Sequence, residues 1–135
     1  MSDFDLVDDY FCKICEYPDA ELTPETKALV DVWHSFGLIE NGGIHGYISG
    51  VGSFAKDVAL RYRSIDLVRS AELIEEAYAF WKEYCPSMNV DVSDPDEFRD
   101  RYTNELDRIE TEFYDLESQI QSHLASIVRT QTDRG

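Results

Sequence analysis

Glycine is concentrated in one short stretch of this chain. Five of the seven glycines fall between positions 42 and 52. Because glycine has no Cβ, it reaches backbone conformations with positive φ and allows other groups to approach closely. The sequence on both sides repeats apolar residues at helical spacing, so this window is expected to hold the least regular backbone of a helical chain. Asn41, Gly42 and Gly43 are predicted to form a tight turn at the centre of the fold.

The first predicted helix spans about 14 residues and is amphipathic. Its apolar positions are Phe4, Val7, Phe11 and Ile14, at spacings of three, four and three. Ser2 stands where a capping residue is expected. A helix of this kind buries one face and exposes the other.

Helix start and stop signals divide the rest of the chain. Thr23-Pro24 and Asp94-Pro95 are capping residues followed by proline at the first helical position, and Gly37 is expected to end the second helix. Two more helices are expected, one capped by Ser53 and one over about 67–83. Beyond Asp94 the apolar spacing predicts one long helix, or two with a break near 103–107, and a loose tail over 130–135. The sequence therefore predicts an all-α fold, a single domain over 1–135 with five to seven helices, a central glycine-rich turn and a long C-terminal helix.

The chain is strongly acidic, with 28 acidic residues against 12 basic ones and a formal net charge of −16. This imbalance repels nucleic acid and anionic membranes and attracts basic partners. The acidic start does not resemble a secretory signal, and no apolar run approaches the roughly 20 residues of a membrane span. We therefore expect a cytoplasmic protein that binds neither nucleic acid nor membrane directly.

Acidic residues near the N-terminus are the least neutralised. In the first 25 residues eight acidic side chains accompany a single basic residue, Lys13. Helical geometry places some of these acids on the face opposite the apolar positions, which exposes them to a partner. The predicted partner-binding residues are Asp5, Asp9, Glu16, Asp19 and Glu21.

Catalytic and metal sites are poorly supported by the sequence. His45 and Glu40 could form an acid–base pair, but no nucleophile or second acid stands at a fixed spacing from them. The Cys12/Cys15 pair lacks the second ligand pair that a zinc site needs. We therefore expect no enzyme activity, no metal and no cofactor, while a small ligand-binding or hydrolase domain around His45 stays open as an alternative.

One stretch of the sequence resembles a known bacterial family. The run from Trp33 to Gly52, with its Asn-Gly-Gly motif, is similar to the signature of the DNA-mimic-protein-like family. The resemblance continues through the segments 53–59, 71–77 and 106–114, and it covers about 24–128. It implies an acidic all-helical protein whose surface carboxylates imitate DNA phosphates.

The resemblance and the charge together predict a non-enzymatic protein that sequesters a basic DNA-binding protein, such as a transcription regulator or a nucleoid protein. An immunity or antitoxin protein that blocks a basic toxin is an alternative with the same electrostatics. A homodimer is a further expectation, in which Ile120, Leu124 and Ile127 would pack against a second copy. The same residues could instead lie in the core of a monomer.

Overall fold

Three helices begin at the capping residues that the sequence indicates. The computed structural model describes residues 2–16 and 23–133. In it the side chains of Ser2, Thr23 and Asp94 accept hydrogen bonds from backbone N–H groups two or three residues further along. These bonds satisfy donors that a helix N-terminus otherwise leaves without partners. Ser53 occupies the N-cap position of the helix that follows it, as predicted, but its side chain makes no such bond.

The described part of the chain consists of α-helices and one short 3-10 helix, without a β-strand, which confirms the all-α prediction. The elements are α1 (Asp3–Cys15), α2 (Pro24–Val51), α3 (Phe54–Ser64), α4 (Val68–Tyr84), η1 (Val90–Val92), α5 (Pro95–Arg101), α6 (Thr103–Asp115) and α7 (Glu117–Asp133).

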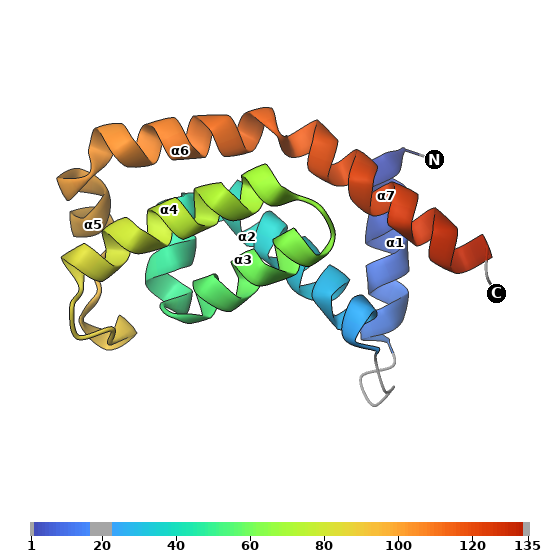
Figure 1. The fold of residues 1–135 in the computed structure, drawn as a ribbon, viewed down its shortest axis with the longest axis horizontal. Coiled ribbons are helices and arrows are strands. Elements are labelled where there is room, and N and C mark those ends of the chain that lie inside the picture. The colour runs from blue at the N-terminus through green and yellow to red at the C-terminus, as the bar shows by residue number, and fades with distance from the viewer. Residues whose placement is uncertain (1, 17–22, 134–135) are drawn as a thin grey trace.

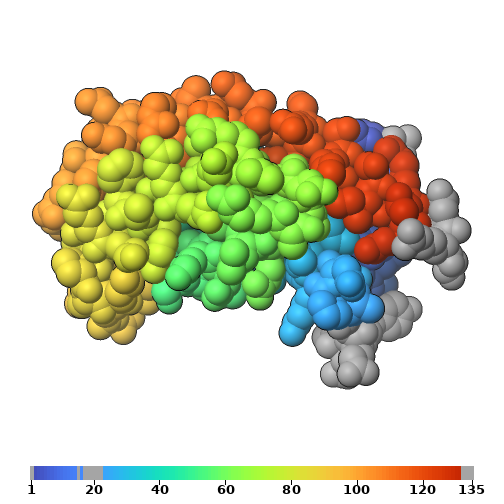
Figure 2. Space-filling model, viewed as in Figure 1, coloured from blue at the N-terminus to red at the C-terminus, as the bar shows by residue number. Residues whose placement is uncertain are grey.

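Helix α2 is the central helix, and most of the other helices pack against it. The helices α3 and α4 lie side by side, and α2 contacts α3, α4, α5 and α6 (Figure 1). The N-terminal and C-terminal helices, α1 and α7, pack together at one end of the molecule, and α5 lies at the other end. Figure 2 shows the side chains of α3 and α4 closing over the middle of the same face, with α6 along its edge.

The glycine window bends α2 instead of ending it. The helix passes through Gly37 without a stop and continues to Val51, so the predicted end at Gly37 and the predicted tight turn are both wrong. Gly43 alone among the residues inside α2 leaves helical geometry, with φ 79° and ψ 159°, and it kinks the helix there. Asn41 and Gly42 are helical. The helix ends at Gly52, whose φ of 57° suits a C-terminal glycine.

The C-terminal third forms three helices, so the prediction of one long helix is wrong. The alternative break near 103–107 is found at Tyr102, but a second break that was not predicted follows at Leu116. Tyr102 separates α5 from α6 with a non-helical backbone, and Leu116 separates α6 from α7. Figure 1 shows α6 and α7 following one another along one side of the molecule with a bend between them. Residues 130–133, expected in a loose tail, belong to α7.

One hydrophobic core joins all the α-helices. Its largest fully buried side chains include Trp81 of α4, Tyr62 of α3 and Phe113 of α6. Ile120 and Leu124 of α7 are buried in it with no exposed surface. These two residues therefore lie in the core of their own chain and are not available to a second copy.

Candidate functional site

The outer face of α1 carries the predicted acidic surface. Val7 and Phe11 are buried against the rest of the protein, whereas Asp5, Asp9 and Glu16 are exposed. Asp9 forms an ion pair with Lys13 at 3.0 Å. Asp5 and Glu16 form no ion pair with any described residue. We call Asp5, Asp9 and Glu16 the α1 acidic face; Asp19 and Glu21, also predicted as contacts, lie outside the described residues.

The arginines that the structure describes all form ion pairs within the protein. Each of the seven arginines that the structure describes lies within 4.0 Å of a carboxylate oxygen. Some of these pairs are local, such as Arg101 with Glu97 on α5. Others connect distant segments, such as Arg61 of α3 with Asp31 of α2 and Arg129 of α7 with Asp3 of α1. The described arginines therefore neutralise carboxylates within the fold, several of them between helices. Many of the remaining acidic residues that the structure describes have no positive charge beside them.

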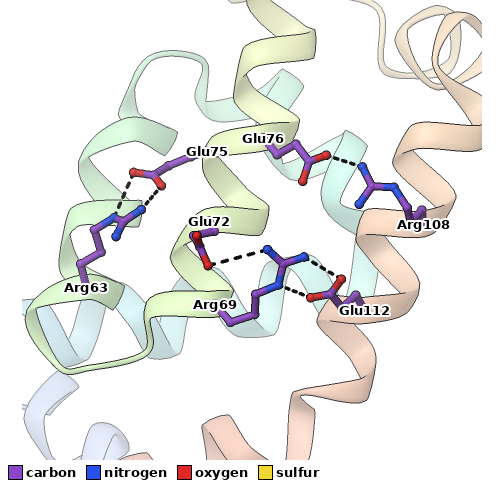
Figure 3. A network of polar contacts seen from close by, with 7 residues as sticks. All are labelled: Arg63, Arg69, Glu72, Glu75, Glu76, Arg108 and Glu112. Atoms are coloured by element: carbon purple, nitrogen blue, oxygen red, sulfur yellow. Dashed lines mark hydrogen bonds and ion pairs between the residues drawn. The ribbon is translucent and has the colours of Figure 1, made fainter.

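A network of such pairs joins α4 to α3 and to α6 (Figure 3). Arg69 of α4 contacts Glu72 of its own helix and binds Glu112 of α6 through two nitrogens, one of them at 2.7 Å from Oε1. This arginine lowers the pKa of the Glu112 carboxyl below its usual value. The remaining pairs are Arg63 with Glu75, between α3 and α4, and Arg108 with Glu76, between α6 and α4.

A second acidic surface lies at the α5 end of the molecule. From Glu83 to Asp107 the chain holds eight acidic residues and two arginines, a net charge of −6. Both arginines pair locally, Arg99 with Asp107 at 3.8 Å and Arg101 with Glu97 at 3.3 Å. The fold gathers the end of α4, η1, α5 and the start of α6 at this end (Figure 1). The surface is not apparent from the local sequence, because acids and arginines alternate along it, but the net charge summed over 83–107 indicates it.

The kink at Gly43 brings the alternative catalytic residue His45 beside a carboxylate of α6. The kink frees the N–H of Ile44, and Glu110 accepts its hydrogen bond through Oε1 at 3.0 Å. His45 Nδ1 lies 3.9 Å from the same oxygen. This carboxylate therefore acts as a cap for the second half of α2. Glu40, the other residue of the alternative, is instead in a separate pocket.

Glu40 lies at the junction of α1, α2 and α7, next to Glu117. Its Oε1 atom is shielded from solvent and has no hydrogen-bond partner among the described residues. Burial, and secondarily the negative charge of Glu117, raise the pKa of the Glu40 carboxyl. An ionised carboxylate in such a position is costly unless a cation accompanies it.

Removing this charge is expected to stabilise the isolated protein. Because folding raises the pKa of Glu40, its stability penalty is absent at low pH and appears as pH rises through the folded-state pKa. Glu40→Gln should therefore increase the free energy of unfolding at pH 7, by about 1 kcal/mol or less because the site is partly open to solvent. The gain should shrink as pH is lowered toward the carboxyl pKa. Urea unfolding across a pH series measures this, with Glu25→Gln on the same helix as control; an equal gain in both variants would contradict it.

Groups of metal ligands and helices able to cross a bilayer are both absent from residues 2–16 and 23–133. Within these residues no three His, Cys, Asp or Glu side chains are grouped so that they could hold a metal ion. None of the helices there combines the length and apolar character that crossing a lipid bilayer requires.

Comparison with known proteins identifies the family. Searches of curated proteins and of solved structures gave no significant match. The family model described as DMP19-like protein matches residues 20–131, which includes every helix except α1 and the last two residues of α7. The model is that of DNA mimic protein 19 and its relatives. With more than four fifths of its residues matched, the chain belongs to the DMP19-like protein family.

Proposed function

We propose that this protein is a non-enzymatic, cytoplasmic DNA mimic that occupies the DNA-binding surface of a basic protein, such as a transcription regulator. The observation that carries the proposal is that most of the positive charges that the structure describes are paired within the fold, whereas part of the negative charge is exposed and unpaired. The described arginines are paired inside the fold, while Asp5 and Glu16 stand exposed without a counter-charge. Family membership supports the same class of partner, since the family is that of a DNA mimic protein.

The spacing of the carboxylates on α1 suits this role. One strand of duplex DNA carries a phosphate about every 3.4 Å of helix axis. An α-helix rises about 1.5 Å per residue, so Asp5 and Asp9 are separated by about 6 Å along α1, and Glu16 follows about 10 Å later. A single helix thus imitates a sparse row of phosphates. A net charge of −16 adds long-range attraction that steers a basic partner toward it.

The proposal is tested by capture followed by competition. Tagged protein is incubated with lysate of the native host, bound proteins are eluted with a salt gradient, and the partner is identified and purified. A DNA-binding protein that is released by moderate salt and displaced by duplex DNA supports mimicry. Capture of a toxin that binds no DNA would favour the immunity alternative, and failure to capture any basic protein would contradict the proposal.

Charge reversal on α1 is expected to abolish partner binding. The variant Asp5→Lys/Asp9→Lys/Glu16→Lys places like charges against a basic surface, and we expect its affinity for the purified partner to fall about 100-fold or more. Isothermal titration calorimetry at fixed salt measures the affinity. Circular dichroism checks that helix content is unchanged.

The matched control reverses three exposed acids at the α5 end, Glu83, Asp91 and Asp100. Both variants change the net charge by the same amount, so any difference between them reports on location. We expect the control to lose less than about fivefold. A loss confined to the control would move the contact surface to the α5 end. Equal, small losses in both variants would contradict phosphate mimicry.

A further inference from the structure

A pocket opens beside the α1 acidic face, where α1, α2 and α7 meet. It has a volume of about 310 Å³. This is at the small end of the range for ligand pockets and suits one side chain more than a large ligand. Its lining comes from Phe4 and Asp8 of α1, from the segment 33–41 of α2, and from Glu117 and Gln121 of α7.

One wall of the pocket is aromatic. The ring of Trp33 lies 5.5 Å from that of Phe4, and it is nearly parallel to the rings of Phe11 (5.9 Å, 16°) and Phe36 (5.8 Å, 22°). Phe4 remains 46% exposed although it is a large apolar residue. Aromatic faces attract cations, tryptophan most strongly, and a planar cation can stack on them.

The other wall is negatively charged. Asp8, Glu40 and Glu117 all line the pocket, and no described lysine or arginine forms an ion pair with any of them. Glu117 accepts a long hydrogen bond, 3.5 Å, from the Gln121 amide. Glu40 Oε1 is buried and has no donor, which is an unusual state for a carboxylate oxygen. The pocket therefore combines a partly exposed aromatic wall with three carboxylates that have no described cationic partner.

We propose that this pocket binds one arginine side chain of the basic partner. A guanidinium is planar, permanently charged, and carries five N–H donors in a fork that matches carboxylate oxygens. It can pack on the exposed ring of Phe4 while it donates to the carboxylates of Glu40 and Glu117. A lysine ammonium supplies charge but lacks the flat face and the paired donors.

This inference rests on the proposed function for the identity of the partner, but the pocket can be tested without one. The probe is N-acetyl-L-arginine N-methylamide, titrated into the full ¹⁵N-labelled protein and followed by NMR. Trp33 reports on the pocket through its indole N–H. Trp81 is an internal control, since its ring is fully buried and its indole N–H donates to Ser93. We expect a saturable shift of the Trp33 signal and none of the Trp81 signal.

Three further titrations test the chemistry. The citrulline analogue has nearly the same shape without the charge and should give no saturable shift. The lysine analogue should bind several-fold more weakly. Magnesium chloride at matched ionic strength should leave Trp33 unmoved. A linear shift with the arginine probe, or an equal response to citrulline or magnesium, would overturn the inference.

Two variants locate the binding. Glu40→Gln should weaken binding of the arginine probe about tenfold, because it removes the buried acceptor charge. Glu25→Gln, an exposed glutamate of the same helix outside the pocket, should bind like the wild type. Since Glu40→Gln is expected to stabilise the free protein, unfolding cannot explain a loss of binding.

The same two variants separate this inference from the proposed function. If Glu40→Gln weakens partner binding about tenfold and Glu25→Gln does not, the occupant is a partner side chain. If partner binding depends on the α1 acidic face but is unaffected by Glu40→Gln, mimicry stands and the pocket inference fails. If no basic partner exists but the pocket binds the arginine probe as described, the proposed function fails and the assignment of a partner arginine fails with it.

Discussion

Replacing Gly43 with alanine is expected to lower the free energy of unfolding by about 2–4 kcal/mol. Gly43 combines φ 79° with ψ 159°, a region that is essentially reserved for glycine. A Cβ at this position would lie 2.5 Å from Oε1 of Glu110 and 2.8 Å from the His45 ring. It would displace the carboxylate that accepts the Ile44 N–H, so the second half of α2 would lose its cap as well. Chemical denaturation measures the loss.

Gly42→Ala is the matched control for this substitution. Gly42 has helical backbone geometry, and a Cβ there would meet no atom within 4 Å. Alanine is preferred over glycine in a helix interior, so we expect the control to be neutral or to gain up to about 1 kcal/mol. Similar losses at both positions would show that the kink at Gly43 does not depend on its backbone conformation.

Replacing Phe113 with alanine is expected to cost about 3–5 kcal/mol, the usual range for a fully buried phenylalanine. Phe113 of α6 has no exposed surface and connects three helices. Its ring centroid lies 6.4 Å from that of Phe36 on α2 and 6.4 Å from that of Tyr62 on α3. The cost approaches the whole stability of many domains, so the variant should be partly unfolded at 37 °C. Thermal unfolding by circular dichroism measures the effect.

Phe54→Ala is the control for that experiment. Phe54 on α3 is 46% exposed and belongs to no aromatic pair in the described part of the chain. We expect it to lose about 0.5 kcal/mol or less. A small loss at Phe113 would mean that α6 does not hold α2 and α3 together through this ring.

Local signals predicted the helix starts, because a cap depends on neighbouring atoms. Ser2, Thr23 and Asp94 each place an oxygen within reach of N–H groups of the same turn, and all three do so in the structure. The path of the chain through the glycine window could not be predicted from local signals, because it depends on a distant residue. Glu110 lies 66 positions beyond Ile44 and supplies the acceptor that lets the chain resume its helix after Gly43.

The same contrast between local and distant contacts applies to the two candidate sites, the α1 acidic face and the pocket. Helical periodicity is enough to place Asp5, Asp9 and Glu16 on an exposed face, because the first two belong to one helix and Glu16 is its C-cap residue. The pocket could not be predicted, since its aromatic wall and its carboxylates come from three helices, one of which, α7, is far from the other two in sequence. Among the pocket residues only Glu40 is a candidate catalytic residue from the sequence, because it is close to His45 along the chain. In the fold it lies in the pocket, whereas His45 lies beside Glu110.

Because the described arginines are paired within the fold, the exposed acids determine how salt acts on this protein. Salt should have opposite effects on its folding and on its binding to a partner. Ions screen the mutual repulsion of the exposed acids, which eases folding of a chain with a net charge of −16. The same ions weaken the attraction between those acids and a basic partner. The close arginine pairs lose less, because their partners lie within about 4 Å of one another. Rising ionic strength should therefore release the partner while the protein itself stays folded, so the complex can be taken apart and reassembled without passing through an unfolded state.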